Sequence, residues 1–374
     1  MTQTPLSIAH VLTSLCVGGG ERVALLLGAK QVKDGHRVMV VSLEEPPEGA
    51  LTDEFTAAGV TVERVPKGRG FDMTLSTRLW RTFRKARVDV VHTHNPLPLI
   101  YAAPAARAAG ARVVHTKHGP HPDAAHRLWL RRAGAAATDA FVAVSEITAD
   151  FAREIREVAP EKLHVIVNAT DLSHFRPDHA ARRATRALWG MDDDVFIVGT
   201  VGRMAEVKNH VLLVRAVAPL LGEETRLVIA GDGPERARVE LTAEELGVRP
   251  WLTLLGETRD VADALRAFDV FALSSKVEGL PLVIAEAMAT GLPVVSTAVG
   301  GVPTVVADGV TGFLVPEEDE RALRERLRRL HDDPALAAEL GTRARDVALE
   351  RFSDERMARE YVELYAPPVS PHGG

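Results

Sequence analysis

The sequence predicts an α/β protein made of two doubly wound parallel-sheet domains. The chain has 374 residues, which is longer than one hydrophobic core usually supports. Short β-branched runs alternate with longer helical patterns along the chain, and the apolar runs are continuous, as in strands that are buried on both faces of a sheet. The alternation pauses once near the middle, where the two domains should separate.

The expected strands fall into two groups of five. The first group covers 8–12, 37–42, 89–94, 111–116 and 140–145, and the second covers 195–202, 226–231, 251–256, 269–274 and 292–297. Between the groups, proline, a short helical pattern and an acidic run replace the strands. We therefore expect a first domain over 1–178, a linker over 179–194 and a second domain over 195–350, with a C-terminal helix at about 352–366 that packs back on the first domain.

Composition and charge exclude several classes of protein. With 46% hydrophobic and 26% charged residues the chain is typical of a globular protein, and its net charge of -6 argues against nucleic acid as a partner. The single cysteine excludes a disulfide framework and fits a reducing compartment. No signal peptide and no run of roughly 18 apolar residues is present. We expect a cytoplasmic protein, and contact with the inner face of the cell membrane stays open.

A glycine-rich turn follows the first strand. Gly18, Gly19 and Gly20 precede an amphipathic helix, and glycines before a helix N-terminus suit the binding of phosphate. A strict dinucleotide fingerprint would need glycine at Val23, and the second strand ends in Ser42 instead of an acid. A nicotinamide site is therefore disfavoured, while a phosphate loop and a plain turn remain as alternatives.

Two cations follow the first strand of the second domain. In "GTVGRMAEVKNH", Arg203 and Lys208 stand between a strand and a helix, next to Gly202. A guanidinium fork and a mobile ammonium can together neutralise a diphosphate at a helix N-terminus; solvated surface cations are the alternative. After the next strand, Gly231 begins "GDGPER", where a base could lie against the backbone or where the chain simply turns.

Two carboxylates interrupt the apolar stretch "KVEGLPLVIAEAM". Pro281 is compatible with the first turn of a helix, so Glu278 should lie in the preceding loop and Glu286 on the helix. Carboxylates are rarely buried without partners, and sugar hydroxyls are natural partners. Salt-bridged or capping glutamates are the alternative.

Histidines and tryptophans form two further patterns. Histidines cluster in "HTHNP" and "HTKHGPH", but no carboxylate array accompanies them, so hydrogen-bonded rings are favoured and neither a metal nor another cofactor is expected. The helices expected at 78–87 and 126–134 mix tryptophan with arginine. This suits contact with anionic lipid, although ordinary covering helices are favoured.

Taken together, these segments resemble glycosyltransferase family 4, whose members have the GT-B fold. The resemblance runs through nearly the whole chain and is carried by the ordered set "GGGERVALLLGAKQVKDGHRVMVVS", "DVVHTHNP", "VVHTKHG", "FVAVSE", "VIVNATDLSHFRP", "GRMAEVKNH", "AGDGPER" and "EGLPLVIAEAMATGLPVVSTAVGGVPTVVADGVTGFLVP". It implies two facing Rossmann-like domains with a cleft between them. It also implies retaining, metal-independent transfer of a sugar from a nucleotide donor, with the leaving phosphate assisting the acceptor on the same face.

The resemblance also assigns site residues. The catalytic set is Arg203, Lys208, Glu278 and His118, and the donor-binding set is Gly19, Gly20, Gly202, Gly231, Gly279, Leu280, Pro281 and Glu286. Arg203 and Lys208 would hold the diphosphate, and Glu286 would hold the ribose. Glu278 and His118 would face the donor sugar. The chain departs from the family pattern at Ala169, where glycine is usual, and at Thr304, where glutamate is frequent.

The substrates are expected by class only. A UDP-sugar is favoured as donor over a GDP- or ADP-sugar, and the acceptor would be a glycan, a lipid-linked glycan or a small molecule in polysaccharide or glycoconjugate biosynthesis. A nucleotide-sugar epimerase on the same scaffold and a non-catalytic nucleotide-sugar binding protein are the alternatives.

Overall fold

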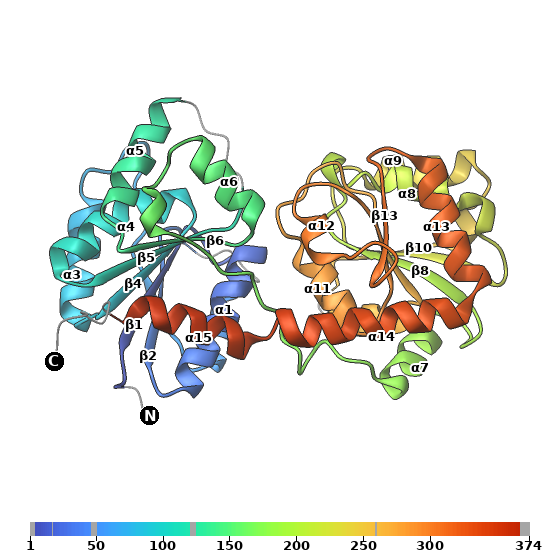
Figure 1. Cartoon of the computed structure of the whole chain (residues 1–374), viewed down its shortest axis with the longest axis horizontal. Helices are drawn as coiled ribbons and strands as arrows, with labels where there is room; N and C mark the ends of the chain where they lie inside the picture. Colours follow the sequence, from blue (N-terminus) through green and yellow to red (C-terminus); the bar gives the residue numbers. More distant parts are fainter. Residues whose placement is uncertain (1–3, 17, 46–50, 120–124, 259, 367–374) are drawn as a thin grey trace. The chain divides into compact units, whose positions relative to one another are not determined.

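The computed structural model describes residues 4–16, 18–45, 51–119, 125–258 and 260–366 (Figure 1). The chain divides into two compact units. The first unit comprises Met1–Ala169 together with Asp354–Gly374, and the second unit comprises Thr170–Ser353. Each unit is built around its own parallel sheet.

The first unit holds a seven-stranded sheet in the order β3-β2-β1-β4-β5-β6-β7, and all of its neighbouring strands are parallel. The order runs from β1 to one edge and then from β4 to the other, so right-handed crossovers place helices on both faces. The doubly wound arrangement that the sequence predicts is therefore confirmed. The strands are β1 (Ser7–Leu12), β2 (Arg37–Ser42), β3 (Thr61–Arg64), β4 (Val90–His94), β5 (Arg112–Lys117), β6 (Ala140–Ala143) and β7 (Leu163–Val165).

The helices of the first unit bury one face each against this sheet or against one another. In α3, Leu75, Leu79 and Phe83 recur every four residues and are all buried, which places them on a single stripe. Helix α4 packs against both α3 and α5. The helices are α1 (Gly19–Lys33), α2 (Thr52–Ala57), α3 (Leu75–Ala86), α4 (Pro96–Ala109), α5 (Ala125–Ala136), α6 (Glu146–Glu154) and the 3-10 turn η1 (Pro160–Lys162).

The C-terminal helix α15 (Asp354–Tyr365) belongs to the first unit and lies beside α1 (Figure 1). Its buried tyrosines bond to groups far away in the sequence. The Tyr361 hydroxyl is 2.9 Å from Thr116 Oγ1 on β5, and the Tyr365 hydroxyl is 2.7 Å from His92 Nδ1 on β4. The helix thus covers polar groups on one face of the sheet and supplies their hydrogen-bond partners.

The second unit holds a six-stranded sheet in the order β10-β9-β8-β11-β12-β13, again with parallel neighbours. The strands are β8 (Phe196–Val201), β9 (Thr225–Ala230), β10 (Leu252–Gly256), β11 (Val270–Leu273), β12 (Val294–Thr297) and β13 (Gly312–Val315). The helices are α7 (His179–Leu188), η2 (Glu206–Lys208), α8 (His210–Val217), η3 (Ala218–Leu220), α9 (Arg236–Glu245), η4 (Arg249–Trp251), α10 (Val261–Ala267), α11 (Leu282–Ala289), α12 (Val302–Val305), α13 (Glu320–Asp332) and α14 (Pro334–Arg351).

The structure differs from the sequence over the expected linker at 179–194. This segment is part of the second unit, and the first unit's main segment ends at Ala169 instead of at residue 178. Helix α7 packs against α10, and its Arg182 and Arg186 bond to Asp269 at 2.6 and 2.7 Å. Since the Arg186 side chain is 1% exposed, this ion pair anchors the otherwise largely exposed helix α7 to the second unit.

Three strands are absent from the sequence-based expectation: β3, β7 and β13. All are short edge strands, and β7 is only three residues long. Strand β3 reads "TVER" and is mostly exposed, so it lacks the continuous apolar run of a buried strand. Exposure explains why β3 is missed, whereas β13 is mostly buried and is missed because its four residues are too short a run to stand out.

Candidate active site

In the second unit, the predicted residues gather at the carboxyl ends of three neighbouring strands. Gly202 follows β8, Gly231 follows β9, and the loop with Glu278 follows β11. These strands are adjacent in the order β9-β8-β11. Ligands of open parallel sheets bind at this edge, so the sheet topology brings the predicted residues of this unit to one end of the domain.

Two glycines allow the loops after β8 and β9 to touch. The Gly202 amide donates to the Ala230 carbonyl at 2.9 Å. Gly231 has a φ of 142°, and a Cβ atom there would lie 2.1 Å from the Gly202 carbonyl oxygen. Only glycine fits this conformation and contact. The backbone that carries Arg203 is therefore held against the neighbouring loop.

Lys208 and Glu278 form a partly buried ion pair. Lys208 Nζ donates to Glu278 Oε1 at 2.6 Å, and the Ser275 hydroxyl donates to the same oxygen at 2.5 Å. The two charged side chains are 24% and 7% exposed. The sequence predicts both residues at the site but does not predict that they bond to each other, and it does not single out Ser275.

Main-chain contacts join the Lys208 loop to the loop after β11. The Ser274 hydroxyl donates to the carbonyls of Lys208 and Asn209 at 3.1 and 2.9 Å. The Lys276 amide donates to the Val207 carbonyl at 2.8 Å. The cation of Lys208 and the carboxylate of Glu278 are thus positioned by a shared framework in addition to their own bond.

A glycine pair after β12 supports the loop that contains Glu278. A Cβ atom at Gly300 would lie 1.7 Å from the Glu278 carbonyl oxygen, and one at Gly301 would lie 2.1 Å from the Gly279 carbonyl oxygen. Both distances are too short for any side chain, so only glycine fits at either position. The Gly301 amide donates to the Gly279 carbonyl at 2.8 Å. Sequence reasoning did not select this pair as site residues, although two consecutive glycines after a strand are a signal of close backbone approach.

The two glutamates divide as the sequence predicts. Glu278 lies in the loop before α11, and the half-buried Glu286 lies on α11 itself. Pro281 is the N-cap residue, one position earlier than a first-turn proline, and it makes no side-chain cap. Leu280 and Gly279 complete the loop, so the predicted donor-binding backbone directly precedes a helix N-terminus, where amide groups favour negative charge.

The remaining groups near Lys208 set the charge of this edge. Arg203 is exposed and has no ion pair among the described residues. His210 is buried at the start of α8, and burial, with a smaller contribution from Lys208, lowers its pKa to about 4. At neutral pH His210 is therefore uncharged, and Arg203 and Lys208 supply the positive charge on this loop.

In the first unit, the predicted residues His118 and Gly20 lie in contact. Gly19 and Gly20 begin α1, and a Cβ atom at Gly20 would lie 3.3 Å from the His118 ring. Asn95 has a φ of 66°, and its Oδ1 accepts from the His118 amide at 3.3 Å. A positive φ in a residue other than glycine is uncommon, and sequence reasoning did not identify Asn95.

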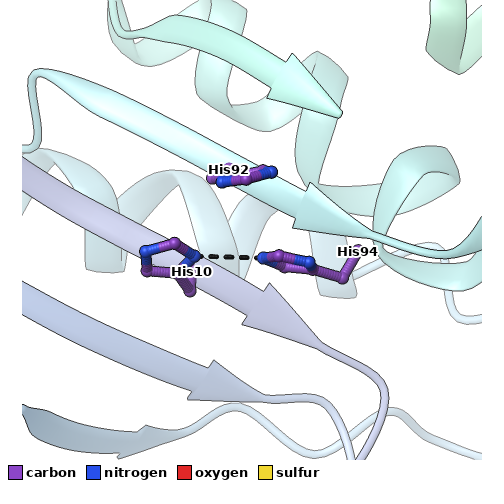
Figure 2. Close-up of side chains that lie close together, drawn as sticks. All are labelled: His10, His92 and His94. Carbon is purple, nitrogen blue, oxygen red and sulfur yellow. Dashed lines mark hydrogen bonds between the residues drawn. The ribbon is translucent and has the colours of Figure 1, made fainter. Parts of the chain in front are cut away.

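Three buried histidines lie together on β1 and β4 (Figure 2). His10, His92 and His94 each offer one nitrogen within 4.8 Å of the others, a set that could hold a metal ion. Hydrogen bonds to neighbouring groups already use both ring nitrogens of each histidine. Burial lowers the pKa of all three rings, that of His10 to about 4. Neutral, hydrogen-bonded rings account for the cluster.

Family models match both units of the chain. The model described as Glycosyl transferases group 1 matches residues 181–347, and the model described as Glycosyltransferase Family 4 matches residues 17–174. A D-inositol 3-phosphate glycosyltransferase of Xylanimonas cellulosilytica is 34% identical over 74% of this chain and 72% of that protein. An N-acetyl-alpha-D-glucosaminyl L-malate synthase of Bacillus anthracis is 27% identical over 93% of this chain and 94% of that protein.

The fold has close counterparts among solved structures. HepE of Anabaena, solved in complex with UDP, has a TM-score of 0.85 and 20% identity, covering 96% of this chain and 99% of that one. The chain belongs to the group 1, family 4 glycosyltransferases and has the GT-B fold. It is a transferase of glycoconjugate biosynthesis. Among the described residues, no helix is long and apolar enough to span a membrane.

The buried histidines predict how stability depends on pH. The pKa of His10 is about 4 in the folded chain and near 6.5 in an unfolded one. The unfolded chain therefore binds the proton more readily, so the stabilisation is complete above pH ~6.5 and is lost as the pH falls toward 4. We expect His10 to contribute a loss of about 2 kcal/mol in the free energy of unfolding between pH 7 and pH 5.

Urea unfolding of native chain and His10→Asn at both pH values measures this contribution. The substitution should lower stability at pH 7 but also reduce its dependence on pH. An equal loss between pH 7 and pH 5 in both proteins would contradict the assignment of His10 as a neutral buried ring.

Proposed function

We propose that this chain is a retaining, metal-independent glycosyltransferase that moves a sugar from a nucleotide sugar, with a UDP-sugar favoured over a GDP- or ADP-sugar. One observation carries the proposal: Lys208 and Glu278 are bonded at 2.6 Å at the carboxyl edge of the second sheet, beside the exposed Arg203. Cations that can neutralise a leaving diphosphate thus lie beside a carboxylate that can accept from sugar hydroxyls. The UDP complex of HepE, which shares this fold, supports the choice of uracil as the base.

In the proposed mechanism, electrostatic stabilisation of the leaving diphosphate is the main catalytic contribution. Arg203 and Lys208 would bear the charge that develops on the diphosphate, and Gly202 and Gly231 would let the backbone approach the nucleotide. Glu286 would accept from the ribose hydroxyls, and Glu278 from the donor sugar. The acceptor would attack from the face that the diphosphate leaves, which retains the anomeric configuration.

The acceptor is proposed as a glycan, a lipid-linked glycan or a small molecule. The names of the two relatives contain L-malate and D-inositol 3-phosphate, which are small anionic molecules. A panel of such acids and phosphates, beside lipid-linked and free glycans, is therefore the rational first screen with UDP-sugars.

Replacing the two cations tests the diphosphate assignment. Arg203→Met and Lys208→Met should each reduce kcat for transfer on the order of 100-fold, because each removes one donor to the developing charge. Lys276→Met is the matched control, since Lys276 lies on the adjoining loop but pairs with Glu206 and Glu318 at 3.8 and 3.5 Å, and it should remain near native. Near-native turnover in both test variants would remove the diphosphate assignment.

The same assay separates the proposal from its alternatives. An epimerase would convert the UDP-sugar without any acceptor, and a non-catalytic binding protein would convert nothing. A chelator should leave transfer unchanged, and loss of transfer with EDTA that added metal restores would contradict metal independence.

Replacing Glu286 tests the ribose assignment. Glu286→Ala should weaken UDP binding by about 1.5 to 3 kcal/mol, the cost of losing hydrogen bonds to a charged acceptor. Isothermal calorimetry measures this affinity. Glu339→Ala is the control, since that carboxylate lies on α14 and is 53% exposed in its pair with Arg343. Equal UDP affinity in native chain and Glu286→Ala would show that the ribose does not bind there.

A membrane-facing surface is also proposed, with the chain in the cytoplasm. Trp80 on α3 and Trp129 on α5 are 37% and 61% exposed, and both helices pack against α4. Exposed cations accompany them on α3: Arg81, Arg84 and Lys85. Apolar rings among cations suit the surface of an anionic bilayer.

Vesicle co-sedimentation tests this surface. The native chain should sediment with vesicles that contain an anionic phospholipid at low salt, and less with neutral vesicles, because the cations require anionic headgroups. The double variant Trp80→Ser and Trp129→Ser should bind less. Equal binding of the native chain to anionic and neutral vesicles would contradict the proposal. Equal binding of the native chain and the double variant to anionic vesicles would also contradict it.

A further inference from the structure

The first unit contains a cavity of about 650 Å³ at the amino ends of β1, β2 and β3. Ser7 and Arg37, the first residues of β1 and β2, line it on the side of the sheet, and the C-terminal half of α3 lines it on the other side. Its volume lies within the range of small-molecule sites. We call this space the α3 cavity.

The α3 cavity lies where the apolar core of the unit gives way to a polar edge strand. Met39 on β2 packs against the core cluster that holds Leu79 and Phe83 of α3, and it also lines the cavity. One strand further out, β3 contributes Thr61 and Glu63 to the wall, two positions apart and so on one face of the strand. These polar residues offer the apolar stripe of α3 nothing to pack against.

Positive charge exceeds negative charge around the cavity. The cations among its described lining residues are Arg37, Arg81 and Lys85, against one carboxylate, that of Glu63. Within the described part of the chain, none of these four groups forms an ion pair. Guanidinium forks and ammonium groups are the side chains that bind phosphate, so the excess of cations favours a ligand with a phosphate group.

Two nearly buried donors border the same space. Ser7 and His36 are each 7% exposed. His36 Nδ1 accepts from the Leu6 amide at 3.1 Å, and burial lowers the pKa of His36, so the neutral ring carries its proton on Nε2. Neither this N–H nor the Ser7 hydroxyl has a hydrogen-bond partner among the described residues. Buried polar groups normally have partners, and an anion in the cavity would supply acceptors to both.

The remaining walls indicate what the phosphate is attached to. The Glu63 carboxylate can accept from hydroxyl groups, and Thr61 and Thr82 add hydroxyls of their own. Apart from the nearly buried His36, no described lining residue is aromatic, so no exposed ring is available to stack on a nucleotide base. The cavity is also much larger than a free phosphate ion. These walls favour a hydroxylated body over a nucleotide.

We propose that the α3 cavity binds a phosphate ester of a sugar or polyol, with Arg37, Arg81 and Lys85 on the phosphate and Glu63 on the hydroxyls. This site lies at the opposite edge of the sheet from Gly20, which follows the carboxyl end of β1. The six residues of β1 span roughly 17 Å at about 3.3 Å per residue. Binding in the cavity does not require the transferase activity proposed above.

Isothermal calorimetry of the full-length chain with glucose 6-phosphate tests the cations. Arg81→Met and Lys85→Met should each weaken binding about tenfold, because each removes one charged donor to the phosphate. Arg84→Met is the matched control, since Arg84 is an exposed cation of the same helix that does not line the cavity, and it should bind like the native chain. Equal affinity in the native chain and both test variants would overturn the proposal.

Further arms of the titration test the buried donor and the ligand class. Ser7→Ala should weaken binding about fivefold, whereas Arg203→Met should not change it, because Arg203 belongs to the second unit. Glucose and inorganic phosphate should each bind at least tenfold more weakly than the ester. Loss of binding in Arg203→Met, or equal binding of the ester and either fragment, would overturn the site.

A polyol phosphate ester is found both in free sugar phosphates and in the headgroup of phosphatidylinositol, and co-sedimentation distinguishes these sources. Vesicles of phosphatidylinositol and of phosphatidylglycerol carry the same charge, so the proposed membrane-facing surface should bind both equally. Preference for phosphatidylinositol that is lost in Arg81→Met would identify the headgroup. Calorimetric binding of glucose 6-phosphate without that preference, retained in the Trp80→Ser and Trp129→Ser double variant, would identify the free ester. Absence of both would overturn the proposal.

Discussion

The ion pair between Lys208 and Glu278 is the interaction on which the candidate site of the second unit depends. It joins the loop after β8 to the loop after β11 through a contact of 2.6 Å between side chains that are 24% and 7% exposed. Partial burial strengthens such a pair relative to one in water. The same pair fixes the positions of the Lys208 cation and the Glu278 carboxylate relative to α11, the helix that carries Glu286. The proposed places of the diphosphate, the sugar and the ribose depend on these three positions.

Glycine makes this arrangement possible in both units. The Gly202 carbonyl packs against Gly231, the Glu278 carbonyl against Gly300, and the His118 ring against Gly20. A Cβ atom at Gly231 or Gly300 would clash with the carbonyl oxygen, and one at Gly20 would make a tight contact with the ring. The positions of the charged groups are set by backbone segments that approach closely, and the side chains extend from that framework.

The sequence predicts most of the fold because buried parallel strands carry a local signal. It predicts that Glu278 and Glu286 lie in a loop and on a helix, since Pro281 marks the boundary between them. It misplaces α7 as a linker because the partner of Arg186, Asp269, is 83 positions away. The Lys208–Glu278 bond spans 70 positions and is missed for the same reason, as no local pattern records which distant charges will meet.

The buried histidines are another case in which the sequence predicts the position of side chains but not their partners. "HTH" on β4 puts His92 and His94 on one face through the two-residue period of a strand, and this much is visible in the sequence. That His10 stands opposite His92 depends on the register of β1 with β4, and the partners Gln31 and Tyr365 come from α1 and α15. The hydrogen bonds among these groups are therefore a property of the assembled unit.

The most direct test of the central claim is phosphorus-31 NMR of UDP titrated into the full-length chain. The account predicts that the β-phosphorus resonance shifts on binding to the native chain, and that this shift is lost in Lys208→Met while the chain stays folded. The same β-phosphorus shift in both proteins would show that the diphosphate lies away from Lys208, and the proposed site would be wrong.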